Sequence, residues 1–238
     1  MSDWKTIWER KGCQRIGKDL LQSLIEMNGF NHPFSQVSVI DWREKALMIY
    51  EKLGLKTGDK VLDVGCGSGA MSFALKEIDP SLQIFGVDYS TTLIGHAKKA
   101  LPKDKFIAVD AADMNFPKDS FDAVFSHSVF LYFPTQSYAF GVIEKMVDYL
   151  KPGKKGFILN VPDALRMTNR EDTRRNVMSP EVYKNKYEGL RHYYYYKEVL
   201  RDKLHKHNCT SIIPRQKKDS KLDKYTFNIL YTKKRVIR

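Results

Sequence analysis

The stretch Val61-Leu-Asp-Val-Gly-Cys-Gly-Ser-Gly-Ala-Met-Ser72 decides the fold of this chain. Its apolar opening predicts a short buried strand. Gly65, Gly67 and Gly69 follow where the strand must turn sharply into a helix. Glycine suits this turn because it reaches φ values closed to other residues and lets the main chain approach a ligand closely. Residues 70–75 then show helical spacing, so the stretch predicts a nucleotide-sized crevice at the carboxyl end of a parallel strand.

The glycine pattern alone is ambiguous. Gly65, Gly67 and Ala70 also satisfy the dinucleotide-binding pattern G-x-G-x-x-G/A. Asp63 precedes the first glycine by two residues, where a carboxylate can hold a ligand's ammonium and is unfavourable beside a pyrophosphate. Asp88 ends the next apolar segment and can accept both hydroxyls of a ribose, a feature of both kinds of site. Asp63 therefore disfavours a nicotinamide dehydrogenase.

Further motifs follow the glycine turn in a fixed order. They are Gly86-Val-Asp-Tyr-Ser90, Val109-Asp-Ala-Ala-Asp-Met-Asn-Phe-Pro117, Ser120-Phe-Asp-Ala-Val-Phe-Ser-His127 and Leu150-Lys-Pro-Gly153. Together with Asp63 to Gly69, their order and spacing resemble the class I, Rossmann-like S-adenosylmethionine (SAM) dependent methyltransferases of small-molecule type, across roughly residues 40–232. The resemblance implies SAM as the cofactor and S-adenosylhomocysteine as the product. It says little about the methyl acceptor.

The resemblance also implies roles for single residues. Asp63 is expected to meet the methionine ammonium of SAM, and Asp88 the ribose hydroxyls. Tyr89 is expected to cover one face of the adenine, with Asp110 and Ala111 beside the adenine amino group. The other expected cofactor contacts are the backbone of Gly65, Cys66 and Gly67, and the side chains of Ser126 and His127, which would flank the sulfonium.

Strands and helices alternate from residue 60 onward, which predicts an α/β fold. We expect a doubly wound, seven-stranded, mostly parallel sheet with helices on both faces and an antiparallel last strand. The expected strands lie near 60–64, 83–87, 105–109, 122–126, 156–161, 209–213 and 225–232. The expected helices lie near 41–53, 70–78, 91–100, 137–150 and 197–207, with Asp41 as a plausible N-cap of the first.

The amino-terminal 40 residues are expected to form a helical lid, and residues 41–238 the SAM-binding domain. Trp4 and Trp8 lie four apart and begin a helical pattern. Such a lid would place Trp4, Trp8, Phe30 or Phe34 in the wall of an acceptor pocket. The alternative is that the tryptophans only anchor the helix to the core.

Residues 163–195 are expected to form a long irregular insertion that acts as an acceptor lid. The segment is rich in arginine and tyrosine, and arginine forks suit phosphate or carboxylate groups. The alternative is a solvated helix with a tyrosine-rich packing edge. The expected acceptor-binding residues are Tyr132, Arg166, Arg174, Arg175 and His192.

The expected catalytic base is His127, at the end of the fourth strand. An unperturbed imidazole has a pKa near 6.5, which suits proton abstraction at neutral pH. The alternative is that His127 is only a hydrogen-bonding wall of the pocket. Asp163 and His192 are further candidates for the base.

Composition limits the remaining possibilities. A hydrophobic content of 42% indicates a globular protein, and no apolar run approaches the roughly 20 residues of a membrane helix. The first residues lack an apolar signal core, so we expect a cytoplasmic location. Cys13, Cys66 and Cys209 show no metal-ligand spacing, and we expect free thiols and no bound metal.

Positive charge is concentrated in the last third of the chain. Residues 1–150 hold 17 Lys and Arg against 19 Asp and Glu, whereas residues 151–238 hold 23 against 9. This asymmetry favours an anionic acceptor or partner, unless it is only solvated surface.

The leading hypothesis is therefore methyl transfer to an oxygen or nitrogen of a small anionic acceptor. A phosphorylated or nucleotide-linked sugar, or a precursor of a capsule or secondary metabolite, would fit. An RNA methyltransferase is a second hypothesis, although residues 126–130 lack the Asn/Asp-Pro-Pro-Tyr loop of adenine N-methylation. A non-catalytic SAM-binding protein is a third. The sequence predicts neither the acceptor atom nor the oligomeric state.

Overall fold

The central feature of the molecule is a seven-stranded sheet, seen in a computed structural model that describes residues 4–11, 17, 19–31, 35–187, 191–215 and 223–235. The strand order is β3-β2-β1-β4-β5-β7-β6. All neighbours are parallel except β7, which runs antiparallel to both β5 and β6. The strands are β1 (Lys60–Val64), β2 (Gln83–Asp88), β3 (Lys105–Ala108), β4 (Phe121–His127), β5 (Leu150–Pro162), β6 (Cys209–Ile212) and β7 (Thr226–Lys233). The predicted fold class is confirmed.

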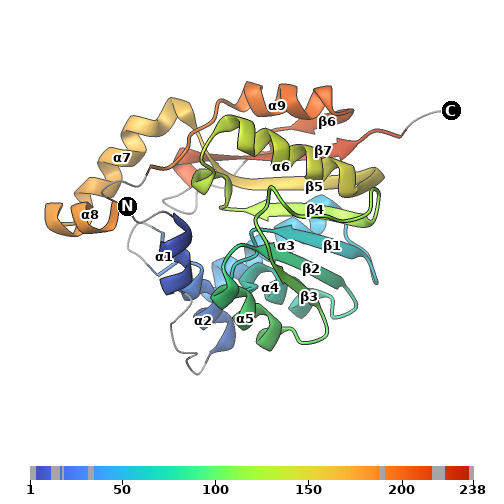
Figure 1. Ribbon diagram of the computed structural model, residues 1–238, viewed down its shortest axis with the longest axis horizontal. Helices are drawn as coiled ribbons and strands as arrows, with labels where there is room; N and C mark the ends of the chain where they lie inside the picture. The colour runs from blue at the N-terminus through green and yellow to red at the C-terminus, as the bar shows by residue number, and fades with distance from the viewer. Residues whose placement is uncertain are drawn as a thin grey trace.

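Helices cover both faces of the sheet (Figure 1). Three of them, α3 (Val39–Leu53), α4 (Ala70–Ile78) and α5 (Thr91–Ala100), bury their apolar side chains in one core cluster. The helices α6 (Gln136–Tyr149) and α9 (Lys197–Lys206) form the other cluster, on the opposite face. Each face of the sheet therefore has its own hydrophobic core, as expected for parallel strands buried on both sides.

The segment boundaries agree closely with the sequence predictions. β1 and the helices α4 and α5 begin and end at the predicted residues. β5 is longer than the predicted 156–161 because Leu150 already pairs with Phe121 of β4, before an irregularity in the ladder. The predicted N-cap of α3 is wrong. Ser38 is the N-cap, and its hydroxyl accepts from the Asp41 N–H at 3.1 Å, while Asp41 completes the reciprocal capping box.

The amino-terminal region divides into two helices with different surroundings. The helix α2 (Leu20–Met27) buries Leu21, Leu24 and Ile25 in the same core as β1 and α4. The helix α1 (Trp4–Lys11) instead buries Trp8 in a small separate cluster with Met27 and Leu93. Of the two, α2 is thus built into the domain core. The division of the chain at residue 40 stays a prediction.

The prediction of an irregular stretch over residues 163–195 is wrong. This region contains the short helix η2 (Ala164–Arg166) and the helices α7 (Met167–Asn176) and α8 (Pro180–Tyr187), at the same end of the molecule as α1 (Figure 1). α7 shows no apolar periodicity because Arg170 and Arg174, one turn apart, are the residues that it buries. A search for apolar spacing therefore misses the helix.

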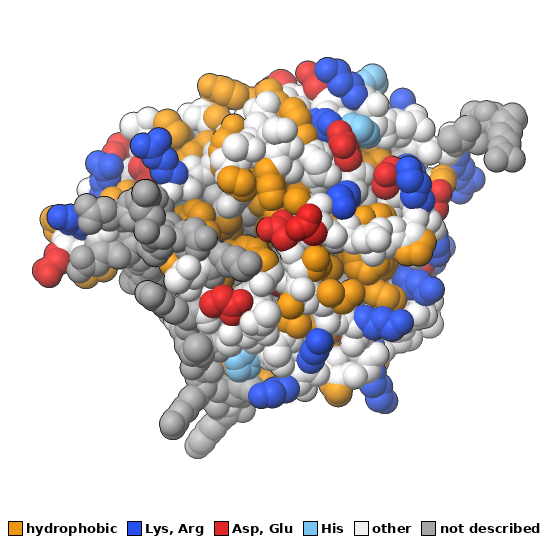
Figure 2. All heavy atoms as spheres, viewed as in Figure 1, with side chains coloured by type: hydrophobic (Ala, Val, Ile, Leu, Met, Phe, Trp, Pro, Cys, Tyr) orange, Lys and Arg blue, Asp and Glu red, His pale blue; other side chains and the backbone are white. Residues whose placement is uncertain are grey.

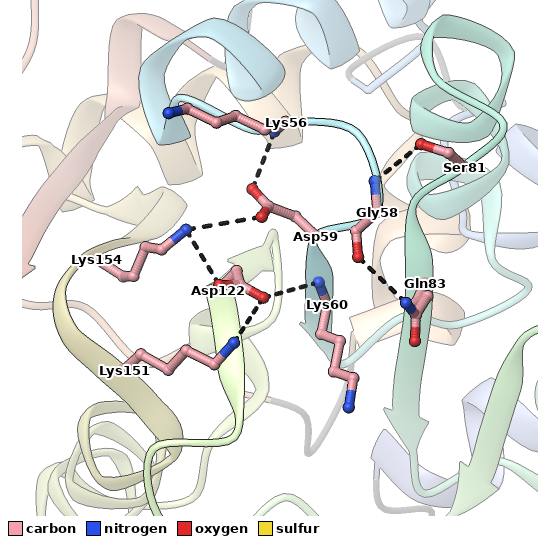
Figure 3. Close-up of polar contacts among 9 residues, drawn as sticks. All are labelled: Lys56, Gly58, Asp59, Lys60, Ser81, Gln83, Asp122, Lys151 and Lys154. Carbon is pink, nitrogen blue, oxygen red and sulfur yellow. Dashed lines mark hydrogen bonds and ion pairs between the residues drawn. The ribbon is translucent and has the colours of Figure 1, made fainter.

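A network of charged side chains joins the amino-terminal ends of the central strands (Figure 3). The Asp122 carboxylate accepts from Lys151 Nζ at 2.9 Å, from Lys154 Nζ at 3.0 Å and from the Lys60 N–H at 3.1 Å. Lys154 Nζ also lies 3.6 Å from the Asp59 carboxylate. Part of the positive charge in the last third of the chain therefore serves this internal network, far from the carboxyl ends of the strands.

Several expectations concern single residues or features of the chain. Cys66 and Cys209 are free and buried, whereas Cys13 and Phe34 lie outside the described residues. Within the described ranges, no group of three or more His, Cys, Asp or Glu side chains could hold a metal ion. Among these same residues, no helix combines the length and the apolar character that crossing a bilayer requires.

Candidate cofactor and acceptor site

A cavity of about 610 Å³ opens at the carboxyl ends of β1, β2 and β4. Its wall includes residues from α1 and α3, from the turn that follows α2 (Asn28 and Phe30), and from the segment that follows α8. The predicted site residues that line it are Asp63, Gly65, Cys66, Gly67, Asp88, Tyr89, Asp110, Ala111, His127, Tyr132 and His192. The structure does not bring Ser126, Arg166, Arg174 and Arg175 to its wall. The lining residues that sequence reasoning did not single out include Asn28, Trp42, Ser128, Val129, Tyr138 and Arg191.

The glycine turn forms the floor of the cavity. Gly65 has a φ of 77°, and a Cβ atom there would lie 2.3 Å from a Val129 methyl carbon. A Cβ on Gly67 would lie 2.3 Å from the Asn28 side-chain oxygen. The N–H groups of Gly65 and Cys66 both donate to the Val87 carbonyl, at 2.7 and 3.0 Å. The missing Cβ atoms therefore let the Val129 and Asn28 side chains pack directly against the turn, and the two hydrogen bonds to Val87 hold the turn in place.

Asp88 connects the glycine turn to the start of α5. Its two carboxylate oxygens accept from the Gly67 N–H and the Ser90 N–H, each at 2.9 Å. Burial raises the pKa of Asp88 to about 6, although both hydrogen bonds act in the opposite direction. The carboxylate is thus oriented by the backbone before any ligand binds.

Asp63 is the most deeply buried acid of the cavity wall, at 2% exposure. Its carboxylate accepts from the Ser72 hydroxyl at 2.7 Å. Burial is the main reason that the pKa of Asp63 rises to about 7, and the negative charge of Asp88 adds to the shift. A cationic group placed in this cavity would stabilise the ionised form of Asp63.

Asp110 is held by a residue that the sequence did not identify. Its Oδ1 atom accepts from the Ala112 N–H at 2.9 Å and from the Tyr138 hydroxyl of α6. Burial and this hydrogen bond raise the pKa of Tyr138 well above the ordinary value. Tyr138 also lines the cavity, so α6 contributes to the site that the strand ends define.

His127 lies between two aromatic rings and the polar side chain of Asn160 on β5. Its ring stacks on Phe30, with centroids 5.7 Å apart, and meets the edge of Trp42 at 5.2 Å. The Asn160 Nδ2 atom lies 3.2 Å from His127 Nε2 and donates to the Ser128 hydroxyl at 3.0 Å. The Asn160 amide orients both residues, and an isolated asparagine in a strand gave no sequence signal for this role.

The backbone at this end of β4 and β5 is strained. Ser128 has a φ of 59° and Asn160 a φ of 56°, both in the left-handed region that non-glycine residues seldom adopt. The buried Asn160 N–H donates to the Asn228 side chain at 2.8 Å, which helps to hold this conformation. Strain of this kind often occurs at functional sites.

The environment of His127 weakens it as a base. Burial, with a smaller contribution from the positive charge of Lys45, lowers the pKa of His127 well below the ordinary value. Its imidazole is therefore neutral at pH 7. The role of His127 as the catalytic base stays a prediction.

The helix α1 combines the two interpretations of its tryptophans. Trp4 and Trp8 both line the cavity. The Trp4 indole N–H donates to the Arg191 carbonyl at 3.0 Å, and its ring stacks on His192 at a centroid distance of 4.7 Å. Trp8 packs against the edge of Tyr132 at 5.2 Å. The tryptophans therefore anchor α1 and form one wall of the cavity.

Glu9 fastens α1 to the first turn of α5. Its carboxylate accepts from the N–H groups of Thr91 and Thr92, at 2.9 and 3.3 Å, and from the Thr92 hydroxyl at 2.7 Å. A carboxylate at a helix N-terminus also interacts favourably with the helix dipole. Glu9 therefore holds α1 close to Asp88, which lies just before this helix.

We expect Glu9→Ala to release α1 and to raise the Kd of SAM about tenfold, because charge-assisted hydrogen bonds to the α5 terminus are lost. Isothermal titration calorimetry measures the Kd, and acrylamide quenching of tryptophan fluorescence reports the exposure of Trp4 and Trp8. Glu51→Ala, on the exposed face of α3, is the matched control. Equal quenching and equal Kd values for both variants would show that Glu9 does not hold α1.

The arginines of the segment 163–195 have different positions. Arg170 and Arg174 are buried in α7, and Arg174 pairs with Glu171 at 3.0 Å. Arg175 extends over the Tyr183 ring, 5.3 Å from its centroid, and is exposed. Arg191 does line the cavity. Arg174 and Arg175 therefore lie away from the cavity wall, to which Arg191 belongs, and contact of these arginines with an acceptor stays a prediction.

Comparisons with known proteins agree with this geometry. Residues 61–153 match the family described as a methyltransferase domain. Over 112 residues, the chain is 34% identical to phosphoethanolamine N-methyltransferase 1 of Arabidopsis thaliana, a match that covers 45% of this chain and 22% of that relative. Over 75 residues, it is 37% identical to trans-aconitate 2-methyltransferase of Rhodopseudomonas palustris, covering 32% of this chain and 29% of the relative. The chain thus matches less than a third of the length of either relative.

Solved structures share the fold over nearly the whole chain. The N-methyltransferase NodS of Bradyrhizobium japonicum, solved with S-adenosyl-L-homocysteine, superposes with a TM-score of 0.63 at 15% identity and covers 98% of this chain and 99% of its own. This likeness extends beyond the residues that match the family, to the whole sheet and its helices. Residues 61–153 therefore form a methyltransferase domain, and the chain as a whole has the fold of the class I, Rossmann-like SAM-dependent methyltransferases.

Proposed function

We propose that this protein transfers the methyl group of SAM to an oxygen or nitrogen of a small anionic acceptor. The observation that carries the proposal is that one cavity joins two carboxylates, the buried Asp63 and the half-buried Asp88, to a wall formed by Trp4, Arg191 and His192. The first part suits a nucleoside with a free ammonium. The second part suits an acceptor with negative charge.

The residues of the first part fit SAM on their own chemistry. Asp63 and Asp88 are acids with raised pKa values, so an ammonium and ribose hydroxyls would stabilise their ionised forms. Gly65 and Gly67 line the cavity with backbone atoms alone, so the main chain would lie against the nucleoside. Tyr89 and Asp110 would then hold the adenine, at the side of the cavity nearest β2 and β3. When bound, SAM supplies a methyl group that its sulfonium activates. After the transfer, the sulfur belongs to the neutral thioether S-adenosylhomocysteine.

The role of the chain in the reaction is then mainly positioning. An acceptor held against Trp4, Tyr132 and His192 faces the part of the cavity that His127 and the glycine turn enclose. Correct alignment of two reactants can account for much of a rate enhancement. The neutral His127, fixed by Asn160, serves in this proposal as a wall of the pocket and a hydrogen-bonding group.

The names of the relatives support an anionic acceptor. Phosphoethanolamine carries a phosphate, and trans-aconitate carries carboxylates. RNA is less well supported, because residues 126–130 lack the Asn/Asp-Pro-Pro-Tyr loop of adenine N-methylation. On the one face that Figure 2 shows, the positive side chains are scattered among acidic and apolar ones. Recognition of RNA phosphates requires clustered positive charge.

A screen for SAM consumption tests the proposal. The purified protein is incubated with SAM and with nucleotide sugars, phosphorylated metabolites, carboxylates, neutral amines or transfer RNA, and S-adenosylhomocysteine is measured. Methylation of at least one phosphate- or carboxylate-bearing compound is expected. Methylation of neutral amines or RNA alone would contradict the anionic acceptor, and SAM binding without any turnover would favour a non-catalytic protein.

We expect His127→Asn to lower kcat by less than about 100-fold, because a positioned general base contributes 10²–10⁴-fold and His127 has a lowered pKa. For the wild type, kcat should show no inflection from this residue near pH 6.5. Both quantities are measured between pH 5.5 and 8.5 with an acceptor from the screen. A larger loss, together with an inflection that disappears in the variant, would establish His127 as the base.

A further inference from the structure

We propose that Arg174 is a positioning residue that fixes the proton of His192 on Nε2, and that this N–H donates to the anionic group of the acceptor. The inference rests on the proposed function, since it places an acceptor in the cavity. It gives different roles to Arg174 and His192, both of which the sequence analysis expected to bind the acceptor directly. Arg174 lies behind the cavity wall, and His192 lies in the wall.

The contact between the two side chains determines the tautomer. One Arg174 guanidinium nitrogen lies 2.6 Å from His192 Nδ1. A guanidinium has only donors, so the imidazole nitrogen must accept and cannot carry a proton. A neutral imidazole that accepts at Nδ1 has its N–H at Nε2. Arg174 thus makes His192 a hydrogen-bond donor through its second nitrogen.

The surroundings of Arg174 hold it in this orientation. Its other terminal nitrogen donates to both oxygens of Glu171, at 3.0 and 3.1 Å, and the residue is only 4% exposed. Glu171 also accepts from the Tyr183 hydroxyl at 3.1 Å and from the Tyr194 hydroxyl. Tyr194 in turn accepts from Arg170 at 3.1 Å. A buried polar network therefore fixes the guanidinium without any ligand.

The His192 ring is also fixed on its faces. It stacks on Trp4 with an interplanar angle of 12°, and it meets the Tyr132 ring at 5.5 Å. Both partners line the cavity, and so does Arg191, which directly precedes His192 in the chain. A neutral N–H donor suits an oxygen of a carboxylate or phosphate, and the positive charge of Arg191 in the same wall would favour such an anion. The chemical class of the acceptor group is therefore an oxyanion.

The tautomer can be measured without any acceptor. Two-bond ¹H–¹⁵N spectra of protein labelled with ¹⁵N-histidine distinguish the Nε2–H form from the Nδ1–H form, and His192→Gln identifies the His192 signals among the six histidines. The wild type and Arg174→Lys, which keeps a cationic donor, should show the Nε2–H form. Arg174→Met should show a mixture of both forms. An Nδ1–H form in the wild type, or an unchanged form in Arg174→Met, would overturn the inference.

Binding of anions tests the second half of the inference. Orthophosphate, phosphoethanolamine and trans-aconitate are titrated into protein saturated with S-adenosylhomocysteine, with ethanolamine as the probe that lacks an anionic group. At least one anion should shift the His192 Nε2 signal, and Arg174→Met should weaken its binding at least about tenfold. Arg175→Met removes the same charge from an exposed position and should not weaken it.

The outcomes separate this inference from the proposed function. Unchanged affinity for S-adenosylhomocysteine in Arg174→Met, together with weakened anion binding and rescue by Arg174→Lys, would support the positioning role. If no anion shifts the His192 Nε2 signal, or if Arg174→Met and Arg175→Met bind the anion with equal affinity, the inference fails. Turnover in the SAM-consumption screen would still support the proposed function in that case. A thermal melt of each variant shows that it is folded.

Discussion

Asp88→Ala is expected to weaken SAM binding at least about 100-fold. Its carboxylate is the group that the Gly67 and Ser90 N–H donors hold in place beside the cavity, and the variant removes both contacts. Hydrogen bonds to a charged group contribute about 1.5–3 kcal/mol each, and two lost ribose contacts correspond to a factor of 100 or more. Isothermal titration calorimetry with SAM and S-adenosylhomocysteine measures the effect.

Two further variants make this test specific. Asp88→Asn keeps one acceptor oxygen, so its Kd for SAM should lie between those of the wild type and the alanine variant. Asp202→Ala removes an exposed carboxylate from α9 and should leave the Kd unchanged. Wild-type affinity in Asp88→Ala would contradict the placement of the nucleoside across the carboxyl ends of β1 and β2.

Asp63 should make SAM binding and stability depend on pH in opposite directions. The pKa of Asp63 in the folded protein, about 7, lies above its ordinary value of 3.8, so the folded state binds a proton more tightly than the unfolded chain. The contribution of Asp63 to the free energy of unfolding is therefore fully present below pH 4 and is lost as the pH rises to about 7. The loss is on the order of a few kcal/mol.

The affinity for SAM should change the other way. An ammonium pairs with the ionised carboxylate, so the binding constant should rise with pH by up to about tenfold per unit and level off above pH 7. Asp88, whose pKa burial raises to about 6, adds to the trend below pH 6. Calorimetric titrations and thermal melts between pH 5 and 8 measure both quantities.

The variant Asp63→Asn removes the titration while keeping the shape of the side chain. We expect its melting temperature without SAM at pH 8 to exceed that of the wild type, because an ionised buried group is gone. Its affinity for SAM should fall at least about 100-fold at pH 8 and become nearly independent of pH above pH 6, where Asp88 is ionised. A wild-type pH dependence in this variant would show that another group is responsible.

The fold and the cofactor half of the site could be predicted because local sequence determines them. The glycine turn needs residues without Cβ atoms, and Asp63 and Asp88 follow from their distance to that turn along the chain. Apolar runs of strand length identify the parallel sheet, since its strands are buried on both faces. These features require no knowledge of which distant segments meet.

The acceptor side of the cavity depends on contacts between segments that lie far apart in the sequence. Arg174 and Arg191 look equivalent in the sequence, yet one is buried against Glu171 and the other lines the cavity. Tyr138 and Asn160 act through side chains that reach a neighbouring strand or loop. Helix α7 escaped detection because its buried face consists of arginines. Tertiary packing, rather than local pattern, determines all of these.

The attachment of α1 has a consequence for the order of events in a catalytic cycle. The same helix supplies Trp4 and Trp8 to the acceptor side and is fastened by Glu9 beside the residue expected to hold the ribose. If exit of the nucleoside requires α1 to detach, the acceptor side of the cavity loses a wall at the same moment. We therefore expect ordered kinetics, in which the nucleoside binds before the acceptor and its demethylated form leaves last.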